Sequence, residues 1–217
     1  MPRKGSLLRE LPILVLVALV VSLLIKTFLV QFFYIPSGSM ENTLQINDRV
    51  AVNKLPFIGQ TIHRGDVIVF RDPDGWLPEP YAEDTNQVIA KLREGLVAVG
   101  VLPNPAKQYL VKRVVGVAGD KVVCCSTNKK LLINGKETVE PYIFKGNLPS
   151  ESDFSVTVPA GKVWVMGDHR AASADSRFHQ EDINNGMVPL DKVTGRAVAI
   201  IWPLPHLGII SSIDPLP

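Results

Sequence analysis

Apolar residues gather in one long block near the N-terminus of the chain. Residues 11–30 read LPILVLVALVVSLLIKTFLV, in which Lys26 is the only charged side chain. As a helix rising about 1.5 Å per residue, this block would span the roughly 30 Å hydrocarbon layer of a bilayer. Lys26 lies near one end, where its ammonium can extend toward the headgroups. The block is therefore predicted to be a transmembrane anchor.

Positive charges are distributed unevenly around this block. Three basic residues precede it, and apart from Lys26 the next one after it is Arg49. Because positively charged flanks stay on the cytoplasmic side, we expect the bulk of the chain outside. The predicted parts are a cytoplasmic N-terminus at 1–10, a single-pass anchor at 11–30 and an extracytoplasmic domain at 31–217. A removable secretory signal begins in the same way, but its best cleavage pair, Ser37 and Ser39, would discard the strongest candidate chemistry.

Beyond the anchor, the apolar pattern shortens to runs that are typical of strands. They are rich in Val and Ile and are bounded by Gly, Pro, Asn or Asp. Asn134-Gly135 favours a tight hairpin, because both central positions of that turn need positive φ, and Pro159-Ala160-Gly161 separates two further runs. The domain is predicted to be mainly β, with strands at 49–52, 66–70, 109–117, 121–123, 131–133, 155–158, 162–166 and 195–202.

One stretch departs from the β pattern. Residues 72–107 shift to Pro, Asp and Glu and then read NQVIAKLREGLVAVG near their end. Asp84 or Thr85 is a suitable N-cap for a short helix there. The apolar face of that helix would comprise Val88, Leu92 and Leu96. We interpret 72–107 as an insertion in the β domain.

Charge and cysteine content narrow the classes of ligand. The net charge of +2 is small and dispersed, so no nucleic acid partner is expected. Cys124 and Cys125 are adjacent, which does not suit a metal site built from separated ligand pairs. They are either two thiols on a strand or, in an oxidising exterior, a vicinal disulfide. No metal or cofactor is predicted.

Two residues suggest nucleophilic chemistry when they are considered together. Ser39 lies in IPSGSM just past the apolar block, but a serine needs a base to remove its proton. Lys112 lies in the predicted strand YLVKRVV, on the same face as Leu110 and Val114, while Arg113 points the other way. Apolar surroundings lower a lysine pKa from its usual value of about 10.4. A neutral lysine can then replace the histidine of a serine peptidase.

A polar segment follows the predicted strand at 162–166. It reads GDHRAASADSR, in which Asp175 and Arg177 are spaced for a charge-assisted pair. Ser173 is a candidate to direct the lysine amine. Each of these segments alone is compatible with an ordinary loop, and their combination favours a catalytic site.

The combination resembles the bacterial type I signal peptidases, which are serine endopeptidases with a Ser/Lys dyad. The similar segments are SGSM after the apolar block, YLVKRVVGVAGD, and the GD-R-S-DSR pattern of 167–177; the resemblance extends to Trp202. It implies a domain of coiled antiparallel β-sheets, with Ser39 as nucleophile and Lys112 as general base. It also implies an oxyanion hole formed by the Ser37 hydroxyl and the Ser39 backbone N–H.

The resemblance assigns further roles. The supporting residues would be Asp168, Ser173, Asp175 and Arg177, with Ser173 orienting Lys112. The pocket for the substrate residue at −1 would comprise Ile35, Pro36, Met40, Leu44 and Leu110, and the pocket for −3 would include Phe33 and Val111. The expected activity is removal of N-terminal signal peptides, after small residues at −1 and −3, from preproteins that emerge from the export translocon. The expected location is the bacterial plasma membrane, with the lipid bilayer as a partner.

The third segment differs from the commonest family spelling. His169, Ala171 and Ala172 stand where that spelling has Asn, Asp and Asn, so a Ser-His mechanism through His169 is an alternative. An anchored binding or sensor module is another. A Ser/Lys regulator of the self-cleaving repressor type would need a DNA-binding helix-turn-helix where this chain has its apolar block.

Overall fold

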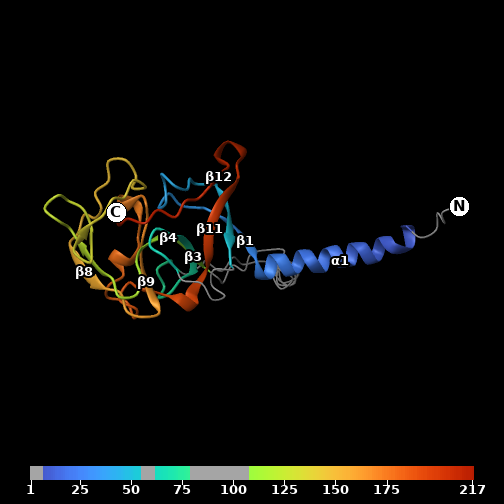
Figure 1. The fold of residues 1–217 in the computed structure, drawn as a ribbon, viewed down its shortest axis with the longest axis horizontal. Coiled ribbons are helices and arrows are strands. Elements are labelled where there is room, and N and C mark those ends of the chain that lie inside the picture. Colours follow the sequence, from blue (N-terminus) through green and yellow to red (C-terminus); the bar gives the residue numbers. More distant parts are fainter. Residues whose placement is uncertain (1–6, 55–61, 79–107) are drawn as a thin grey trace.

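The computed structural model describes residues 7–54, 62–78 and 108–217 (Figure 1). Its helices and strands are α1 (Leu7–Phe28), β1 (Val30–Tyr34), β2 (Arg49–Asn53), β3 (Val67–Arg71), β4 (Tyr109–Gly116), β5 (Lys121–Cys124), β6 (Leu132–Ile133), β7 (Lys136–Glu137), β8 (Phe154–Thr157), β9 (Lys162–Met166), η2 (Arg170–Ala172), η3 (Ser176–Phe178), β10 (Val188–Pro189), η4 (Leu190–Lys192), β11 (Val193–Trp202), η5 (Leu204–His206) and β12 (Gly208–Ile209). The described chain is therefore mainly β, as predicted.

The strands form two antiparallel sheets. The larger sheet has the order β1-β2-β11-β3-β4-β9-β10, with β12 paired to β11, and the smaller has the order β7-β6-β5-β8. In Figure 1 the smaller sheet, around β8, lies on the far side of the domain from α1. The chain passes from the large sheet to the small one at the link between β4 and β5 and returns between β8 and β9.

All the predicted strands are present, with ends that shift by at most two residues. The predicted hairpin turn is also confirmed, because Asn134 and Gly135 have φ values of 53° and 80° and join the paired strands β6 and β7. Pro159-Ala160-Gly161 connects β8 to β9, but these strands belong to different sheets. β10 and β12 were missed because strands of two residues leave no alternating pattern in the sequence, and β1 was missed because its apolar residues continue the run of the preceding helix.

α1 extends away from the sheets (Figure 1). It ends at Phe28, before the predicted limit at residue 30, because Val30 already pairs with Asn53 in the sheet. None of the helices in the described part of the chain combines the length and the apolar character of a membrane span. Of the predicted insertion, residues 79–107 lie outside the described residues, and so does the helix expected there.

Three apolar clusters form the core. One fills the space between the small sheet and β9 and includes Trp164 and Met166. The other two lie on opposite faces of the large sheet: one contains Met40 and Leu44, and the other contains Leu110. Residues of β4 contribute to all three clusters. Lys112, in the middle of this strand, is therefore buried in the domain interior.

The adjacent cysteines are joined in a vicinal disulfide at the end of β5, across a cis peptide bond. The interpretation of Cys124 and Cys125 as two separate thiols is therefore wrong for this structure. The alternative that the sequence also allowed is the one present.

Candidate active site

Ser39 lies in the loop that leaves β1, and the core holds this loop in place. Met40 and Leu44 are buried, and the Leu44 N–H donates to the Met40 carbonyl at 2.7 Å, which closes one turn. On the opposite side, the His169 N–H donates to the Ser39 carbonyl at 3.2 Å. The buried residues of its own loop and the hydrogen bond from the polar segment after β9 thus fix the position of Ser39.

Lys112 reaches Ser39 from the middle of β4, which lies between β3 and β9 (Figure 1). The lysine Nζ is 2.6 Å from the Ser39 Oγ, and the lysine side chain is only 4% exposed. Strand alternation places Lys112 on the face of Leu110 and Val114, as predicted, since those two residues share one apolar cluster. The structure therefore brings the candidate nucleophile and the candidate base into direct contact.

Burial changes the proton affinity of this lysine. Desolvation lowers the Lys112 pKa from 10.5 to about 8; the negative charge of Asp175 opposes the shift and the positive charge of Arg177 adds to it. With a pKa of about 8, roughly one lysine in ten is neutral at pH 7. Lys112 can therefore act as a base near neutral pH.

Asp175 and Arg177 form the charge pair that their spacing predicted. The Arg177 Nε and Nη2 donate to the two carboxylate oxygens of Asp175 at 2.8 and 2.9 Å, and both side chains are buried. The Gly167 N–H also donates to Asp175, at 2.9 Å. Burial disfavours the Asp175 carboxylate, but the hydrogen bonds and charge of Arg177 outweigh it and hold the Asp175 pKa below its usual value. The pair connects the start and the end of the polar segment.

Ser173 does not make the contact expected of it. Its hydroxyl is buried and has no hydrogen-bond partner among the described residues. It lies beside Gly167, where an added Cβ would overlap both the Ser173 hydroxyl and the Ser39 carbonyl oxygen. Ser173 thus packs close to the nucleophile loop, and its role in orienting Lys112 stays a prediction.

Asp168 has a partner that the sequence reasoning passed over. The Arg113 Nε and Nη2 donate to the Asp168 carboxylate at 2.8 and 2.7 Å, and the Arg113 guanidinium lies 4.1 Å above the Tyr142 ring. Thr43 also donates to Asp168. The signal was present, because a charged residue on the inward face of a buried strand requires an opposite charge nearby. This pair ties β4, the Ser39 loop and the polar segment together.

An apolar cleft of about 310 Å³ opens beside the Ser39 and Lys112 side chains. Six of the seven predicted substrate-binding residues line it: Phe33, Ile35, Pro36, Met40, Leu110 and Val111. Leu44 does not, because its side chain is fully buried in the apolar cluster that also contains Met40. The lining residues that the sequence reasoning missed are Tyr34, Trp76, Leu77, Tyr109, Ala172 and Ala174, and Ser37 also belongs to the wall.

Ser37 and His169 are the other two residues near Ser39 that the sequence singled out. The Ser37 Oγ is 3.5 Å from the Ser39 Oγ. The His169 ring is engaged elsewhere: its Nδ1 is 2.9 Å from the Glu41 carboxylate, and it stacks on Phe144 with ring centroids 4.1 Å apart. Ser39 therefore has Lys112, and not His169, as its partner.

A hydroxyl in contact with a buried, partly neutral amine, at the edge of an apolar cleft, is suited to acyl transfer from a peptide. Comparison with known proteins gives the same class. Residues 8–202 match the family described as signal peptidase, peptidase S26. The chain belongs to this family of serine peptidases, and its function is the removal of signal peptides.

Two relatives match the sequence of this chain over almost its whole length. A signal peptidase I of Mycobacterium tuberculosis (strain H37Rv) is 37% identical, and the match covers 99% of this chain and 79% of that protein. A probable signal peptidase I of Mycobacterium leprae is 35% identical over 98% of this chain and 82% of its own length. Among solved structures, a signal peptidase I from Enterococcus faecalis matches with a TM-score of 0.38 and 24% identity, over 63% of this chain and 97% of that one.

Proposed function

We propose that Ser39 and Lys112 carry out the cleavage as a catalytic dyad. The observation that supports this most strongly is the 2.6 Å contact between the two side chains, with Lys112 buried. Neutral Lys112 takes the Ser39 proton while the Oγ attacks the carbonyl carbon of the scissile bond. The lysine then gives that proton to the departing amine of the mature protein. An ester between Ser39 and the signal peptide remains.

The same base completes the cycle. Lys112, neutral again after the mature protein leaves, takes a proton from a water molecule while the water oxygen attacks the ester carbonyl. The bond from that carbon to the Ser39 Oγ then breaks, Lys112 returns the proton to the Oγ, and the signal peptide leaves with a free carboxyl end. The Ser37 hydroxyl and the Ser39 backbone N–H donate hydrogen bonds to the oxyanion in both halves of the reaction. The closeness of the two hydroxyls supports this role for Ser37. Asp168, Asp175 and Arg177 would brace the polar segment of residues 167–177 beside the dyad through their buried ion pairs, and Ser173 would orient Lys112.

The substrate is an extended segment of a preprotein with small residues at −1 and −3. Alternate side chains of an extended chain point to the same side, so residues −1 and −3 would enter the apolar cleft together. Its aromatic and aliphatic walls suit uncharged, apolar side chains at these two positions. The preproteins would reach the enzyme as they leave the export translocon.

The enzyme acts at the bacterial plasma membrane, with residues 11–30 as a single-pass anchor and the N-terminus in the cytoplasm. The apolar sequence of this segment and the basic residues before it support the topology. Large apolar side chains along the described part of α1, including Leu11, Leu16 and Val21, are exposed in the structure. Because α1 leads directly into β1, the cleft would lie next to the bilayer surface. Protease added outside right-side-out vesicles should digest the β domain and spare an N-terminal tag.

Two variants of the purified full-length protein test the dyad. Ser39→Ala and Lys112→Met should each abolish cleavage of a signal-peptide precursor while the fold, measured by circular dichroism, is retained. Substantial cleavage by either variant would refute the dyad. An anchored binding module, the alternative from a different class, predicts that wild type and both variants leave the precursor intact. The mass of the mature product fixes the bond that is cut.

A further inference from the structure

Trp76 lies in the active-site cleft although it belongs to none of the sequence segments discussed for catalysis. It follows β3, in the described start of the predicted insertion, and it lines the cleft together with Leu77, Ser39 and Lys112. Its side chain is 7% exposed. A large aromatic ring in this place limits the room beside the dyad.

The backbone around Trp76 is held by a single carboxylate. The Asp72 side chain accepts hydrogen bonds from the N–H groups of Gly75, Trp76 and Leu77, each at 2.8 Å. Such side-chain contacts to successive backbone groups fix a turn without help from a sheet. The Asp72 carboxylate therefore fixes the backbone turn that carries the indole.

The indole ring is also packed from two directions. It stacks on the His179 ring with centroids 4.4 Å apart and an angle of 6° between the planes, and it meets the Phe70 ring edge to face at 5.8 Å. These contacts leave the ring little freedom to turn aside for a larger substrate. A long aliphatic side chain at this position has more rotatable bonds and would yield more easily to a larger substrate.

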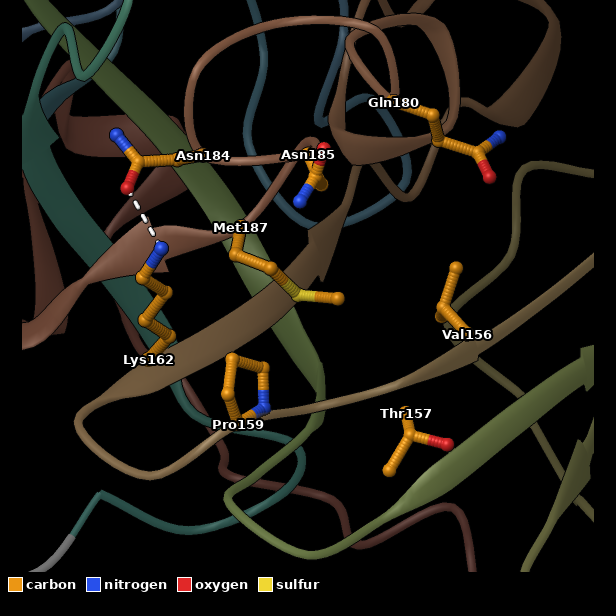
Figure 2. A pocket seen from close by; sticks show the side chains of 8 residues that line it. All are labelled: Val156, Thr157, Pro159, Lys162, Gln180, Asn184, Asn185 and Met187. Atoms are coloured by element: carbon orange, nitrogen blue, oxygen red, sulfur yellow. Dashed lines mark hydrogen bonds between the residues drawn. The ribbon is translucent and has the colours of Figure 1, made fainter.

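A second set of hydrogen bonds anchors the Trp76 turn to the segment after η3. The Asn184 N–H and side-chain amide donate to the two Asp74 carboxylate oxygens at 3.0 and 2.7 Å. The Lys162 Nζ donates to the Asn184 side-chain oxygen at 2.7 Å, at the rim of a separate cavity of about 250 Å³ (Figure 2). The turn is thus supported from β9 as well as from its own residues.

The place of Trp76 relative to the dyad indicates which substrate residue it meets. Trp76 belongs to the same apolar cluster as Leu110, and Leu110 shares a face of β4 with Lys112. The substrate residue whose carbonyl is attacked is the one nearest to the nucleophile and its base. We propose that Trp76 is a specificity-determining residue that limits the size of the side chain at −1, with His179 as a positioning residue behind it. The inference rests on the proposed dyad of Ser39 and Lys112.

The test measures kcat/KM of the full-length enzyme in detergent for precursor peptides that carry Ala, Val or Leu at −1. Parallel sets vary −3 and +1 in the same way. Trp76→Ala should raise the Leu-to-Ala ratio at −1 by about tenfold or more, which is the range expected when apolar pocket volume changes by a few carbon atoms. His179→Ala should shift that ratio in the same direction by a smaller factor. The ratios at −3 and +1 should stay unchanged.

Three further variants make the outcome decisive. Trp76→Phe should keep the wild-type ratio, and Trp76→Leu provides the shortened wall if Trp76→Ala does not fold. Trp202→Ala is the matched control, because Trp202 is 50% exposed and does not line the cleft. An unchanged ratio at −1 in the folded shortened variant, or relaxation at −3 or +1 instead, would overturn the inference. Cleavage by Ser39→Ala would refute the proposed dyad but not the role of Trp76. The Leu-to-Ala ratios of the Trp76 variants are measured in separate experiments.

Discussion

Replacing the candidate base should make the protein more stable while it removes activity. Lys112 is 4% exposed and forms a 2.6 Å hydrogen bond to Ser39. A methionine at this position has a similar length, adds no charge and suits the apolar neighbours on that face of β4. The variant Lys112→Met therefore relieves the cost of burying an ammonium group.

The size of the effect follows from the pKa. The decrease from 10.5 to about 8 corresponds to about 3 kcal/mol, at about 1.36 kcal/mol per pKa unit. Loss of the hydrogen bond to Ser39 costs about 1 kcal/mol, so the net gain at pH 7 is about 2 kcal/mol. For a chain of 217 residues this is a rise in Tm of about 4–8 °C.

The gain should depend on pH in a defined direction. The folded-state pKa of Lys112 is below its unfolded value, so between pH 8 and 10.5 the unfolded wild type binds more protons than the folded one. Wild-type stability therefore rises with pH across this window. Below pH 8 the wild type carries the full cost of burying the charged lysine. At about pH 9.5 only about 1 kcal/mol of that cost remains, and the hydrogen bond that Lys112→Met loses offsets it.

Thermal denaturation followed by circular dichroism, in one detergent at pH 7 and pH 9.5, measures this difference. Lys112→Met should have the higher Tm at pH 7 and a similar Tm at pH 9.5. Leu110→Met, on the same face of β4, is the matched control and should show no such pH dependence. A Lys112→Met variant that is less stable than wild type at pH 7, or equally stabilised at both pH values, would refute the reasoning.

Three other outcomes follow from the site. The kcat/KM for precursor cleavage should rise with pH through an apparent pKa of about 8, because only neutral Lys112 accepts the serine proton; a rise centred near the ordinary lysine value would argue against this. Asp168→Asn should lower the free energy of unfolding by about 3–5 kcal/mol, because it leaves Arg113 buried without its partner charge, and an unchanged urea midpoint would contradict that. His169→Asn should keep most of the precursor-cleaving activity, whereas a loss as complete as in Ser39→Ala would favour a Ser-His mechanism.

Local pattern was sufficient for most of the large sheet. The strands β4 and β9 combine Val-rich runs with clear Gly, Asp or Pro boundaries, and strand alternation then placed Lys112 and Arg113 on opposite faces. β1 was not predicted, because it directly follows an apolar helix and its hydrophobic residues continue the same run. Its strand character comes from pairing with β2, which is a tertiary interaction.

The pairing of Ser39 with Lys112 could be predicted from the sequence. A serine and a lysine that are 73 positions apart need a common fold to meet, and the family resemblance supplied that fold. The contacts between segments distant in the sequence were harder to predict. The Trp76 ring stacks on His179, and the nearby Asp74 accepts hydrogen bonds from Asn184. Both partners lie more than a hundred positions away, so no local pattern records these contacts. Leu44 packs in the core and not in the cleft wall, and this depends on tertiary packing against residues distant in the sequence such as Val67 and Ala197.

The central claim is that Ser39 attacks the substrate with the help of Lys112. Rapid mixing of the full-length enzyme with a signal-peptide precursor, followed by acid quenching and mass analysis of the digested enzyme, tests it most directly. The account predicts an added mass equal to the acyl portion of the signal peptide, on the fragment that contains Ser39 and absent from Ser39→Ala. An adduct on any other side chain, or one that persists in Ser39→Ala, would contradict it.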